Sequence, residues 1–502
     1  MSSSTASDNR IDHLEERNVI MSKTRREWLF NAGYGLGGVA LNGFMPGGGV
    51  FSVPLAQAAA TFVDPLTKKD PHFAPKVKSV IWLHMDGAPS TLDLYDYKPE
   101  LVRLAGQEVP ESFLKGLQVT TSGGAGKLFA SKRTWKQYGQ SGAWFSDLLP
   151  NLAQHADKIT FVKSSVTVGA THDISILKLN TGDVTPGRPS LGAWVTYALG
   201  SANPDLPPYV VLYSGKREPR GGSVNWSSGF LPAVYQGTAF RPGASPILNL
   251  DKPELIAAAQ QRDNLDLLQK LNEHKSGEQP SDTELQARTR SYELAYRMET
   301  SAPEAVDLSK ETAATKALYG LDNDATKDYG TTLLRARRLV ERGVRFIQVV
   351  SGPVDAIADD NKNWDAHRKL EENHGANTRA IDKPIAGLLA DLAARGLLDE
   401  TLVVWTSEFG RTSYGQSGDG RDHNPWGYTQ WLAGGGLKHG LTYGATDEIG
   451  LKTVENPVDT YDLHATVLQL LGLDHLKTVY LRAGRAERPT VVYGKVVGDL
   501  LA

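Results

Sequence analysis

The chain has 502 residues, of which 40% are hydrophobic and 22% charged, and these proportions are typical of a folded globular protein rather than a disordered chain. Its 54 Lys and Arg against 57 Asp and Glu give a net charge of −3, so no nucleic-acid partner held by a general basic surface is expected. The absence of cysteine excludes disulfides, thiolate metal sites and a cysteine nucleophile. Any metal must therefore be held by His, Asp, Glu, Asn or Gln.

The N-terminal segment has the order of features found in a twin-arginine export signal. Arg25-Arg26 precedes large apolar residues, a weakly apolar, glycine-rich run follows over 32–53, and Ala56-Gln57-Ala58 has the small-x-small pattern read by a signal peptidase. A flexible tail with an incidental arginine pair is the alternative. We predict that residues 1–58 are an export signal recognised by the twin-arginine translocation machinery. The mature protein is then expected in the periplasm or cell envelope, without a stable membrane span.

Short apolar runs alternate with helical patterns along the rest of the chain. The runs predict strands at 77–83, 159–163, 209–213, 344–350 and 402–406. Helical patterns at 327–342 and 377–395 each have arginine in the last turn and glycine beyond it, which is typical of a helix end. This alternation predicts an α/β fold with a mostly parallel central sheet and helices on both faces.

Residues 59–502 are predicted to form a single α/β domain with two interruptions. Residues 215–250 are rich in glycine and proline and predict a loop-rich insertion that could cover the sheet edge as an active-site flap. Residues 264–318 are helical and charged. They either form an inserted helical subdomain or extend the helix layer of the sheet.

Polar side chains gather where the predicted strands end and in loops marked by Gly, Trp and Pro. The four groups are His84 with Asp86, Asp93 and Asp96; Thr171-His172-Asp173; Asp365 with His367 and His374; and Glu408 with Arg411, Arg421 and His423. A thiol-free metal site needs carboxylates and imidazoles that converge from separate strand ends. Such a set suits zinc, manganese or iron, while calcium or magnesium fits if the histidines face the substrate instead. Two such metals could hold the attacking and leaving oxygens of an ester displacement.

Seven blocks of sequence over roughly residues 70–500 carry a family resemblance. They are IWLHMDGAPSTLDLYDYKPEL, THDISILKLNTG, RPSLGAWVTYALGS, NWDAHRKLEENH, TLVVWTSEFGRT, GRDHNPWGYTQWLAGGGLKHGLTYGATDE and DLHATVLQLLGLDH. In this order they resemble a large bacterial group of exported, sulfatase-like proteins that carry a domain of unknown function. That group is similar to the alkaline phosphatase superfamily, which also contains sulfatases, nucleotide pyrophosphatases and cofactor-independent phosphoglycerate mutases.

The resemblance implies one or two divalent metal ions, with zinc, manganese or calcium as candidates. An Asp directly after the first strand binds metal in the superfamily, and Asp86 matches it, with Asp93 as the second choice. Asp365 and His367 match a metal-binding Asp and His pair, for which His374 is a rival because the spacing is shorter than usual.

Two further positions correspond to metal-binding positions of the superfamily, one of them only in part. Glu408-Phe409-Gly410 falls where the superfamily has Asp-His-Gly, so Glu408 can serve as a ligand whereas Phe409 cannot. His423 matches the last metal-binding His of the superfamily. His464 lies in a segment similar to a structural helix start of sulfatases, so we interpret it as structural.

The expected nucleophile is the point of departure from the superfamily. It stands ten residues before a Thr-Gly pair, and counting back from Gly182 gives His172 in place of Ser, Thr or Cys, with Thr171 adjacent. The sulfatase signature of Cys or Ser followed by x-Pro-Ser-Arg is absent. The resemblance therefore leaves a metal-bound water or Thr171 as nucleophile rather than a formylglycine, with His172 or Arg411 stabilising negative charge.

The implied function is an exported, metal-dependent hydrolase of a sulfate or phosphate ester, with a sulfated glycan as one candidate substrate. The alternative is a non-catalytic, sulfatase-like protein that binds anionic glycans or an envelope partner. The missing nucleophile and Phe409 in place of a ligand His favour the alternative. A resemblance in fold does not by itself establish an activity.

Overall fold

The computed structural model describes residues 64–117, 124–243, 246–247, 258–278, 283–354 and 363–502. The predicted export signal at 1–58 lies outside these residues. The described residues belong to one compact unit. In this part of the chain, no helix is both long and apolar enough to cross a membrane.

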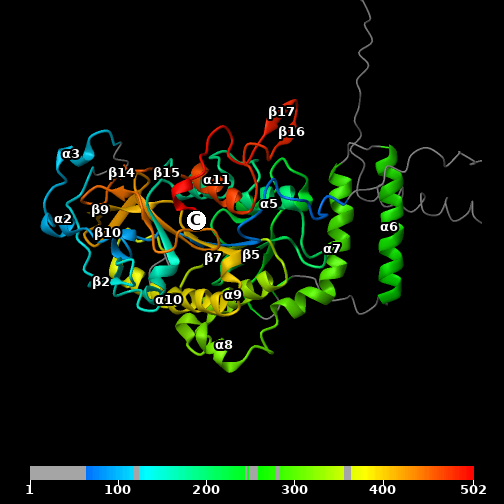
Figure 1. Ribbon diagram of the computed structural model, residues 1–502, viewed down its shortest axis with the longest axis horizontal. Helices are drawn as coiled ribbons and strands as arrows, with labels where there is room; N and C mark the ends of the chain where they lie inside the picture. Colours follow the sequence, from blue (N-terminus) through cyan, green and yellow to red (C-terminus); the bar gives the residue numbers. More distant parts are fainter. Residues whose placement is uncertain (1–63, 118–123, 244–245, 248–257, 279–282, 355–362) are drawn as a thin grey trace, which may run out of the picture. The chain divides into compact units, whose positions relative to one another are not determined.

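A nine-stranded sheet forms the centre of the unit (Figure 1). Its order is β12 (Thr442–Tyr443), β4 (Ile159–Val166), β11 (Tyr428–Gly434), β8 (Thr401–Thr406), β1 (Ser79–Met85), β7 (Phe346–Ser351), β5 (Tyr209–Tyr213) and β6 (Thr238–Phe240), with β15 (Val458–Asp459) paired to β4. Only β11 runs antiparallel to its neighbours among these described strands. The predicted α/β fold with a mostly parallel sheet is confirmed.

The central strand β1 explains why helices cover both faces of the sheet. Ile81 and Leu83 belong to one apolar core, whereas Val80 and Trp82 belong to another. Side chains alternate between the two faces of a strand, and every residue of β1 is buried. Both faces therefore have to be covered, as is usual for parallel sheets.

Helices α9 (Asp324–Glu341) and α10 (Leu370–Ala394) supply the first core, and α5 (Leu191–Leu199) and α11 (Thr460–Leu470) supply the second. Figure 1 shows the two pairs on opposite sides of the sheet. Three further short helices are α2 (Pro99–Arg103), α3 (Glu111–Leu114) and α4 (His172–Thr181). Outside the central sheet, the described strands form four two-stranded pairs: β2 (Trp135–Tyr138) with β3 (Ala143–Ser146), β9 (Gly410–Gln416) with β10 (Gly420–Asn424), β13 (Ala445–Thr446) with β14 (Thr453–Glu455), and β16 (Tyr480–Arg482) with β17 (Arg485–Glu487).

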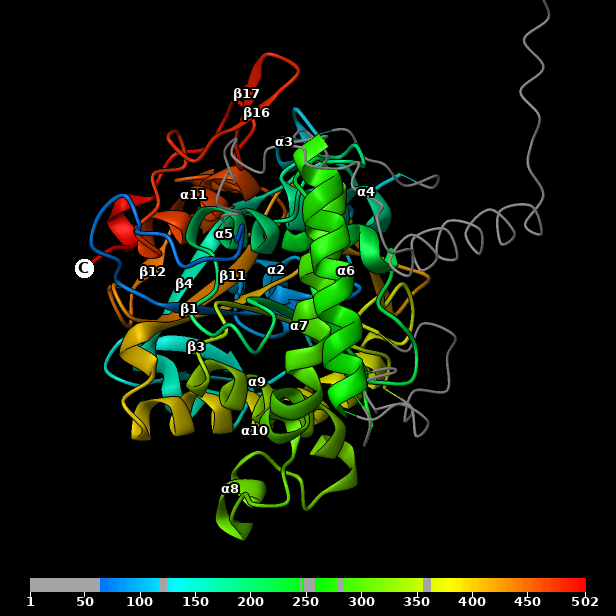
Figure 2. The ribbon, with the colours of Figure 1, turned by 90° about the vertical axis from the view of Figure 1, so that its right-hand side faces the viewer.

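The charged helical stretch consists of α6 (Ala258–Glu278), α7 (Thr283–Val306) and α8 (Ala313–Leu318). Helix α6 packs along α7, and α7 in turn contacts α9 (Figure 2). The stretch joins the rest of the unit through contacts of α7 with α9 and with the helical turn at Ala233–Tyr235, and of α8 with α10.

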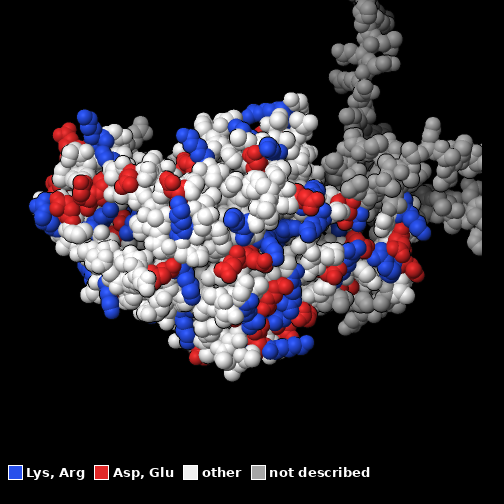
Figure 3. All heavy atoms as spheres, in the orientation of Figure 1, with Lys and Arg blue, Asp and Glu red and all other residues white. Residues whose placement is uncertain are grey.

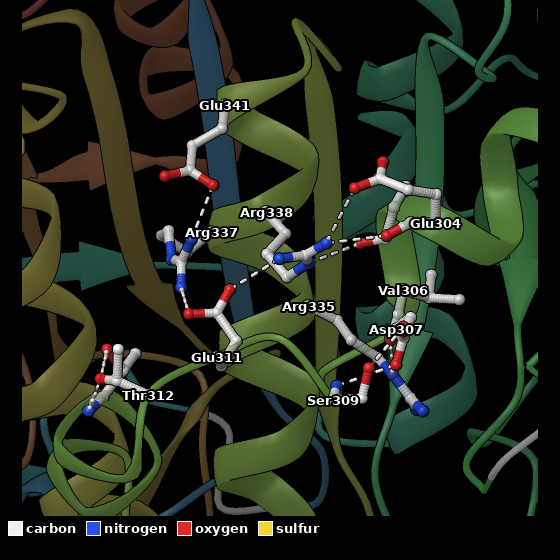
Figure 4. A network of polar contacts seen from close by, with 12 residues as sticks. Glu304, Val306, Asp307, Ser309, Glu311, Thr312, Arg335, Arg337, Arg338 and Glu341 are labelled. Carbon is white, nitrogen blue, oxygen red and sulfur yellow. Dashed lines mark hydrogen bonds and ion pairs between the residues drawn. The ribbon is translucent and has the colours of Figure 1, made fainter.

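A buried arginine of α9 holds the end of α7 (Figure 4). Arg338 donates from Nε to the carbonyl of Ala305 at 3.0 Å and from Nη2 to the carbonyl of Glu304 at 2.7 Å. Its Nη1 donates to Glu311 at 2.7 Å, and Arg337 pairs with the same carboxylate at 2.8 Å. The last carbonyls of a helix have no partner within the helix, so Arg338 supplies one from outside.

Charged side chains of both signs share the surface. On the face shown in Figure 3, acidic and basic groups lie among one another over the described residues. This distribution agrees with the net charge of −3.

Candidate metal centre

Five polar segments meet at one edge of the sheet. Strands β1, β4, β5, β7 and β8 run in the same direction, so their carboxyl ends lie at a common edge. The segments that follow these strands are 86–90, 170–173, 214–226, 363–368 and 407–411. Ligands usually bind at this edge of an α/β sheet, because the loops there converge from several strands.

Glycine at position 87 allows two of these segments to touch. Gly87 has φ +103°, and a Cβ there would lie 2.7 Å from the backbone nitrogen of Asp365. The amide of Trp364 also donates to the carbonyl of Asp86 at 3.1 Å. The loop after β1 is thus fixed against the segment that carries Asp365.

Four side chains from two of these segments and from β10 form a group with the composition of a metal site. His172, Asp365, His367 and His423 each offer one ligand atom, and these atoms lie within 4.8 Å of one another. The Nε2 atoms of His172, His367 and His423 lie 3.1, 3.0 and 3.3 Å from the carboxylate oxygens of Asp365.

The opposite nitrogen of each imidazole faces an oxygen acceptor. Nδ1 of His172 lies 2.7 Å from Oε1 of Glu408, and Nδ1 of His423 lies 2.6 Å from the carbonyl of Ala170. Nδ1 of His367 contacts the side-chain oxygen of Gln416. An acceptor at Nδ1 keeps the proton there and leaves the Nε2 lone pair free, which is how metal-binding histidines are oriented in proteins.

The imidazoles of this group differ in their pKa shifts. Burial lowers the pKa of His423, which favours the neutral imidazole that a metal requires. Burial alone would lower the pKa of His172, but hydrogen bonds with Asp365 and Glu408 outweigh it and raise that pKa. Burial alone would raise the pKa of Asp365, but the close contacts of His172, His367 and His423 and the charge of Arg411 outweigh it, so the pKa is strongly lowered. Asp365 is therefore an ionised carboxylate at the centre of the imidazoles.

Three imidazoles and one carboxylate fit a divalent cation of the zinc, manganese or iron type. The ligand set is mostly buried, with 8% of the Asp365 side chain and 30% of the His367 side chain exposed. His367 thus lies at the open side, where an external molecule could reach the site.

A second acidic group adjoins the first through His172. Glu408 is buried and faces the imidazoles of His172 at 2.7 Å and His84 at 3.2 Å, and it accepts the amide of Gly87 at 2.9 Å. Burial and the charge of Glu408 raise the pKa of Asp86. Oδ1 of Asp86 is buried and accepts no hydrogen bond from the described residues. An unsatisfied carboxylate oxygen is a suitable ligand for a second cation.

The predicted metal ligands are therefore divided between two adjoining groups. Asp365, His367 and His423 lie together, and Asp86 lies with Glu408 on the other side of His172. The contact of Glu408 with the imidazole of His172 joins the groups.

Arg411, predicted to stabilise negative charge on the substrate, is engaged within the protein. Its side chain has 0% exposure and donates to the carbonyls of Ala88 at 2.8 Å and Gly87 at 2.5 Å and to Asp365 at 2.6 Å. The structure thus gives Arg411 the task of positioning Asp365. Arg421 is also fully buried and donates to Asp93 at 2.8 Å.

The other candidates lie outside the ligand group. Thr171 is the exposed N-cap residue of α4, and its side chain makes no capping hydrogen bond. Nε2 of His374 accepts the amide of Ser90 at 2.8 Å, so this ring serves the loop after β1. Nε2 of His464 contacts the carbonyl of Leu179 at 2.8 Å.

Sequence reasoning did not predict where two residues of the site lie. His172 was expected to stabilise negative charge, and its Nε2 lies among the possible ligand atoms around Asp365. Arg220, whose Nη2 lies 3.7 Å from Oδ2 of Asp365, was not singled out. It lies in the loop-rich stretch 215–250, where no periodic pattern reveals which side chain points toward the sheet.

A family model with the description "Protein of unknown function (DUF1501)" matches residues 77–501. No curated protein matches the sequence. Among solved structures, the PsFucS1 sulfatase from Pseudoalteromonas sp. is 14% identical with a TM-score of 0.34, over 79% of this chain and 68% of that chain. The alkaline phosphatase from the Antarctic bacterium TAB5 is 10% identical with a TM-score of 0.33, over 79% of this chain and 98% of that chain. The lipoteichoic acid synthase LtaP from Listeria monocytogenes is 10% identical with a TM-score of 0.32, over 81% and 76%. At this identity and these TM-scores, the matches carry no conclusion about activity.

Proposed function

The chain belongs to the DUF1501 family of proteins of unknown function, and we propose that it is a metal-dependent hydrolase of a phosphate or sulfate ester. The single observation that carries the proposal is the arrangement of three imidazoles around Asp365. Each has its Nδ1 against an oxygen acceptor and its Nε2 directed at the same carboxylate. This arrangement occurs at the edge of the sheet where α/β enzymes bind their ligands.

The residues have separate tasks in this proposal. His172, Asp365, His367 and His423 would hold a divalent cation, and Asp86 with Glu408 would hold a second one. A divalent cation supplies Lewis acidity toward the ester oxygens and increases the acidity of water. The proposed nucleophile is water, with the exposed hydroxyl of Thr171 as the alternative.

One observation favours a second candidate, a non-catalytic protein that binds an anionic glycan. The first residue of α4, where the related superfamily carries its nucleophile, is His172, and its ring is held between Glu408 and Asp365. Phe409 packs on the rings of His172 and His423 at centroid distances of 4.9 and 4.5 Å. Neither His172 nor Phe409 provides a hydroxyl nucleophile.

The test measures metal content and turnover in the same samples. Purified protein is loaded with zinc or manganese, analysed for bound metal, and assayed with p-nitrophenyl phosphate and p-nitrophenyl sulfate. We expect Asp365→Asn and His423→Ala to lose most of the bound metal and at least about 100-fold in turnover. His439→Ala is the matched control, because His439 is exposed and lies outside the ligand group.

The outcomes separate the two candidates. Unchanged metal and turnover in Asp365→Asn would remove the hydrolase proposal. A wild-type protein that turns over neither ester and retains sulfated glycans would support the binding protein instead.

Export by the twin-arginine route and a periplasmic or cell-envelope location are part of the proposal. Their support is the Arg25-Arg26 pair followed by an apolar run and the Ala56-Gln57-Ala58 pattern. Replacing Arg25-Arg26 with Lys-Lys should retain the protein in the cytoplasm, which fractionation of the producing cells measures.

A further inference from the structure

Arg220 has an unusual position for an arginine beside a buried carboxylate. Its Nη2 lies 3.7 Å from Oδ2 of Asp365, which is an ion pair without a hydrogen bond, and 29% of its side chain is exposed. The guanidinium makes no hydrogen bond to any residue that the structure describes. Nη2 of Arg220 thus lies beside the metal centre, and no described residue accepts a hydrogen bond from the guanidinium.

The other two arginines of the site differ from Arg220 in their hydrogen bonding. Arg411 and Arg421 have 0% side-chain exposure and direct their donors at protein carbonyls and carboxylates. Neither can turn toward an external molecule without breaking those bonds. Arg220 has no such bonds to break.

The backbone at Arg220 is held by hydrogen bonding, whereas its guanidinium has only the ion pair with Asp365 among the described residues. Nδ2 of Asn225 donates to the carbonyl of Arg220 at 2.8 Å. Gly221 has φ +80°, and a Cβ there would lie 2.5 Å from the same Nδ2, so the turn requires glycine. The following helical turn η3 (Gly222–Trp226) packs against α4, whose first residue is His172.

The charge of Arg220 reaches both acidic groups. It forms the ion pair with Asp365, and it opposes the effect of burial, which raises the pKa of Asp86. The guanidinium therefore stands near the junction of the two groups, where the proposed ester would be cleaved.

We propose that Arg220 binds the anionic phosphate or sulfate group of the substrate. This inference rests on the proposed ester hydrolase, because it names the residue that receives the ester at that site. The planar guanidinium presents parallel N–H donors that match two oxygens of a tetrahedral anion, an arrangement that a lysine ammonium does not reproduce. In the absence of an anion, the guanidinium rests against Asp365.

The experiment measures anion binding independently of turnover. Inorganic phosphate and, separately, sulfate are titrated into zinc-loaded wild-type protein, Arg220→Ala and Arg220→Lys by calorimetry. We expect the Kd for the preferred anion to rise about 10- to 100-fold in Arg220→Ala, with an intermediate rise in Arg220→Lys. The KM for the chromogenic ester should rise in parallel, while bound zinc stays at the wild-type level.

Arg217→Ala is the matched control, since Arg217 is exposed on the same loop three residues earlier. It should leave anion affinity, KM and metal content unchanged. Thermal melting of every variant reports on folding, and Arg220→Lys keeps the test valid if Arg220→Ala melts early.

The results distinguish this inference from the proposed function. Phosphate or sulfate affinity in Arg220→Ala within twofold of wild type would overturn the assignment, even if the protein hydrolyses esters. Wild-type protein that binds neither anion would overturn it as well. Binding that depends on Arg220 in a protein without esterase activity would retain the anion site and refute only the hydrolase.

Discussion

The Nδ1 atom of His172 lies 2.7 Å from Oε1 of Glu408, and this contact turns the opposite edge of the ring toward Asp365. The two residues are 236 positions apart in the chain. Glu408 lies two residues after β8 and His172 begins α4, so the folded sheet brings them together. The pair connects the imidazole group to the acidic group of Asp86 and Glu408.

Replacing Glu408 with Gln should weaken metal binding while the fold survives. The amide keeps the size of the side chain but removes the negative charge that orients His172 and His84. Loss of such an outer partner typically costs 10- to 100-fold in metal affinity, so we expect a change of about that size. Competition with a chromogenic chelator measures it.

Glu400→Gln is the control for charge alone, because Glu400 forms an exposed ion pair with Lys78. It should bind metal as the wild type does. Equal affinities in all three proteins would mean that Glu408 does not orient a ligand.

Metal should stabilise the folded protein in proportion to its occupancy. A cation that binds the folded state alone adds about 4 kcal/mol at a concentration a thousand times its Kd. We therefore expect zinc to raise the melting temperature and a chelator to reverse the rise. His423→Ala should lose most of this increment. A zinc-induced rise of equal size in that variant would place the bound zinc elsewhere.

Acid should destabilise the protein through its buried neutral histidines. Burial lowers the pKa of His374 to about 3 and that of His464 to about 4, below the usual value near 6.5. Below pH 6.5 the unfolded chain therefore binds protons that the folded chain does not, so stability falls as the pH falls toward these lowered values. Each such group adds up to about 1.4 kcal/mol per pH unit to the slope.

His374→Gln tests this reasoning. The glutamine oxygen can still accept the amide of Ser90, but the side chain no longer titrates. Denaturant unfolding at pH 7.5 and pH 5 should show a smaller loss of stability in this variant than in wild type or in His439→Gln. The same pH slope in all three proteins would contradict a neutral, buried His374.

Arg338→Ala should detach the end of α7 from α9. The substitution leaves the carbonyls of Glu304 and Ala305, the second of them buried, without their donor, and we expect a loss of about 3 kcal/mol in unfolding free energy. Hydrogen exchange should increase over α7. Arg342→Ala is the comparison, because its partner Glu304 is 53% exposed and the pair should contribute at most about 1 kcal/mol. Equal losses in the two variants would mean that Arg338 acts only as a surface charge.

Periodicity located the elements but not their ends. The strand predicted at 77–83 forms as Ser79–Met85, because His84 and Met85 pair with Val350 and Ser351 of β7. This pairing depends on a distant strand and cannot be predicted from the sequence of β1 alone. The helix predicted at 377–395 begins at Leu370. Its first turns are polar and lack an apolar stripe, so periodicity does not reveal them. The segment at 363–367 packs against these turns, and Asn373 and Asn377 donate to the carbonyl of Asn363.

The types of ligand available could be predicted from composition, since a chain without cysteine must use imidazoles and carboxylates. The strand ends at which they lie also followed from local patterns. The sequence did not show which arginine of the site lacks hydrogen bonds to the protein. Only the tertiary contacts show that Arg411 donates to backbone carbonyls whereas Arg220 makes no hydrogen bond to the described residues.

The sequence by itself determined the α/β class, the alternating buried strands and the polar segments at their carboxyl ends, because these depend on residue patterns a few positions long. The tertiary structure decided that His172 faces Asp365 and Glu408, and that Arg220 reaches the same edge from the loop after β5. Those relationships depend on crossovers between distant strands and on an irregular loop whose path is fixed by packing. Side-chain direction in such a loop follows from contacts and not from periodicity.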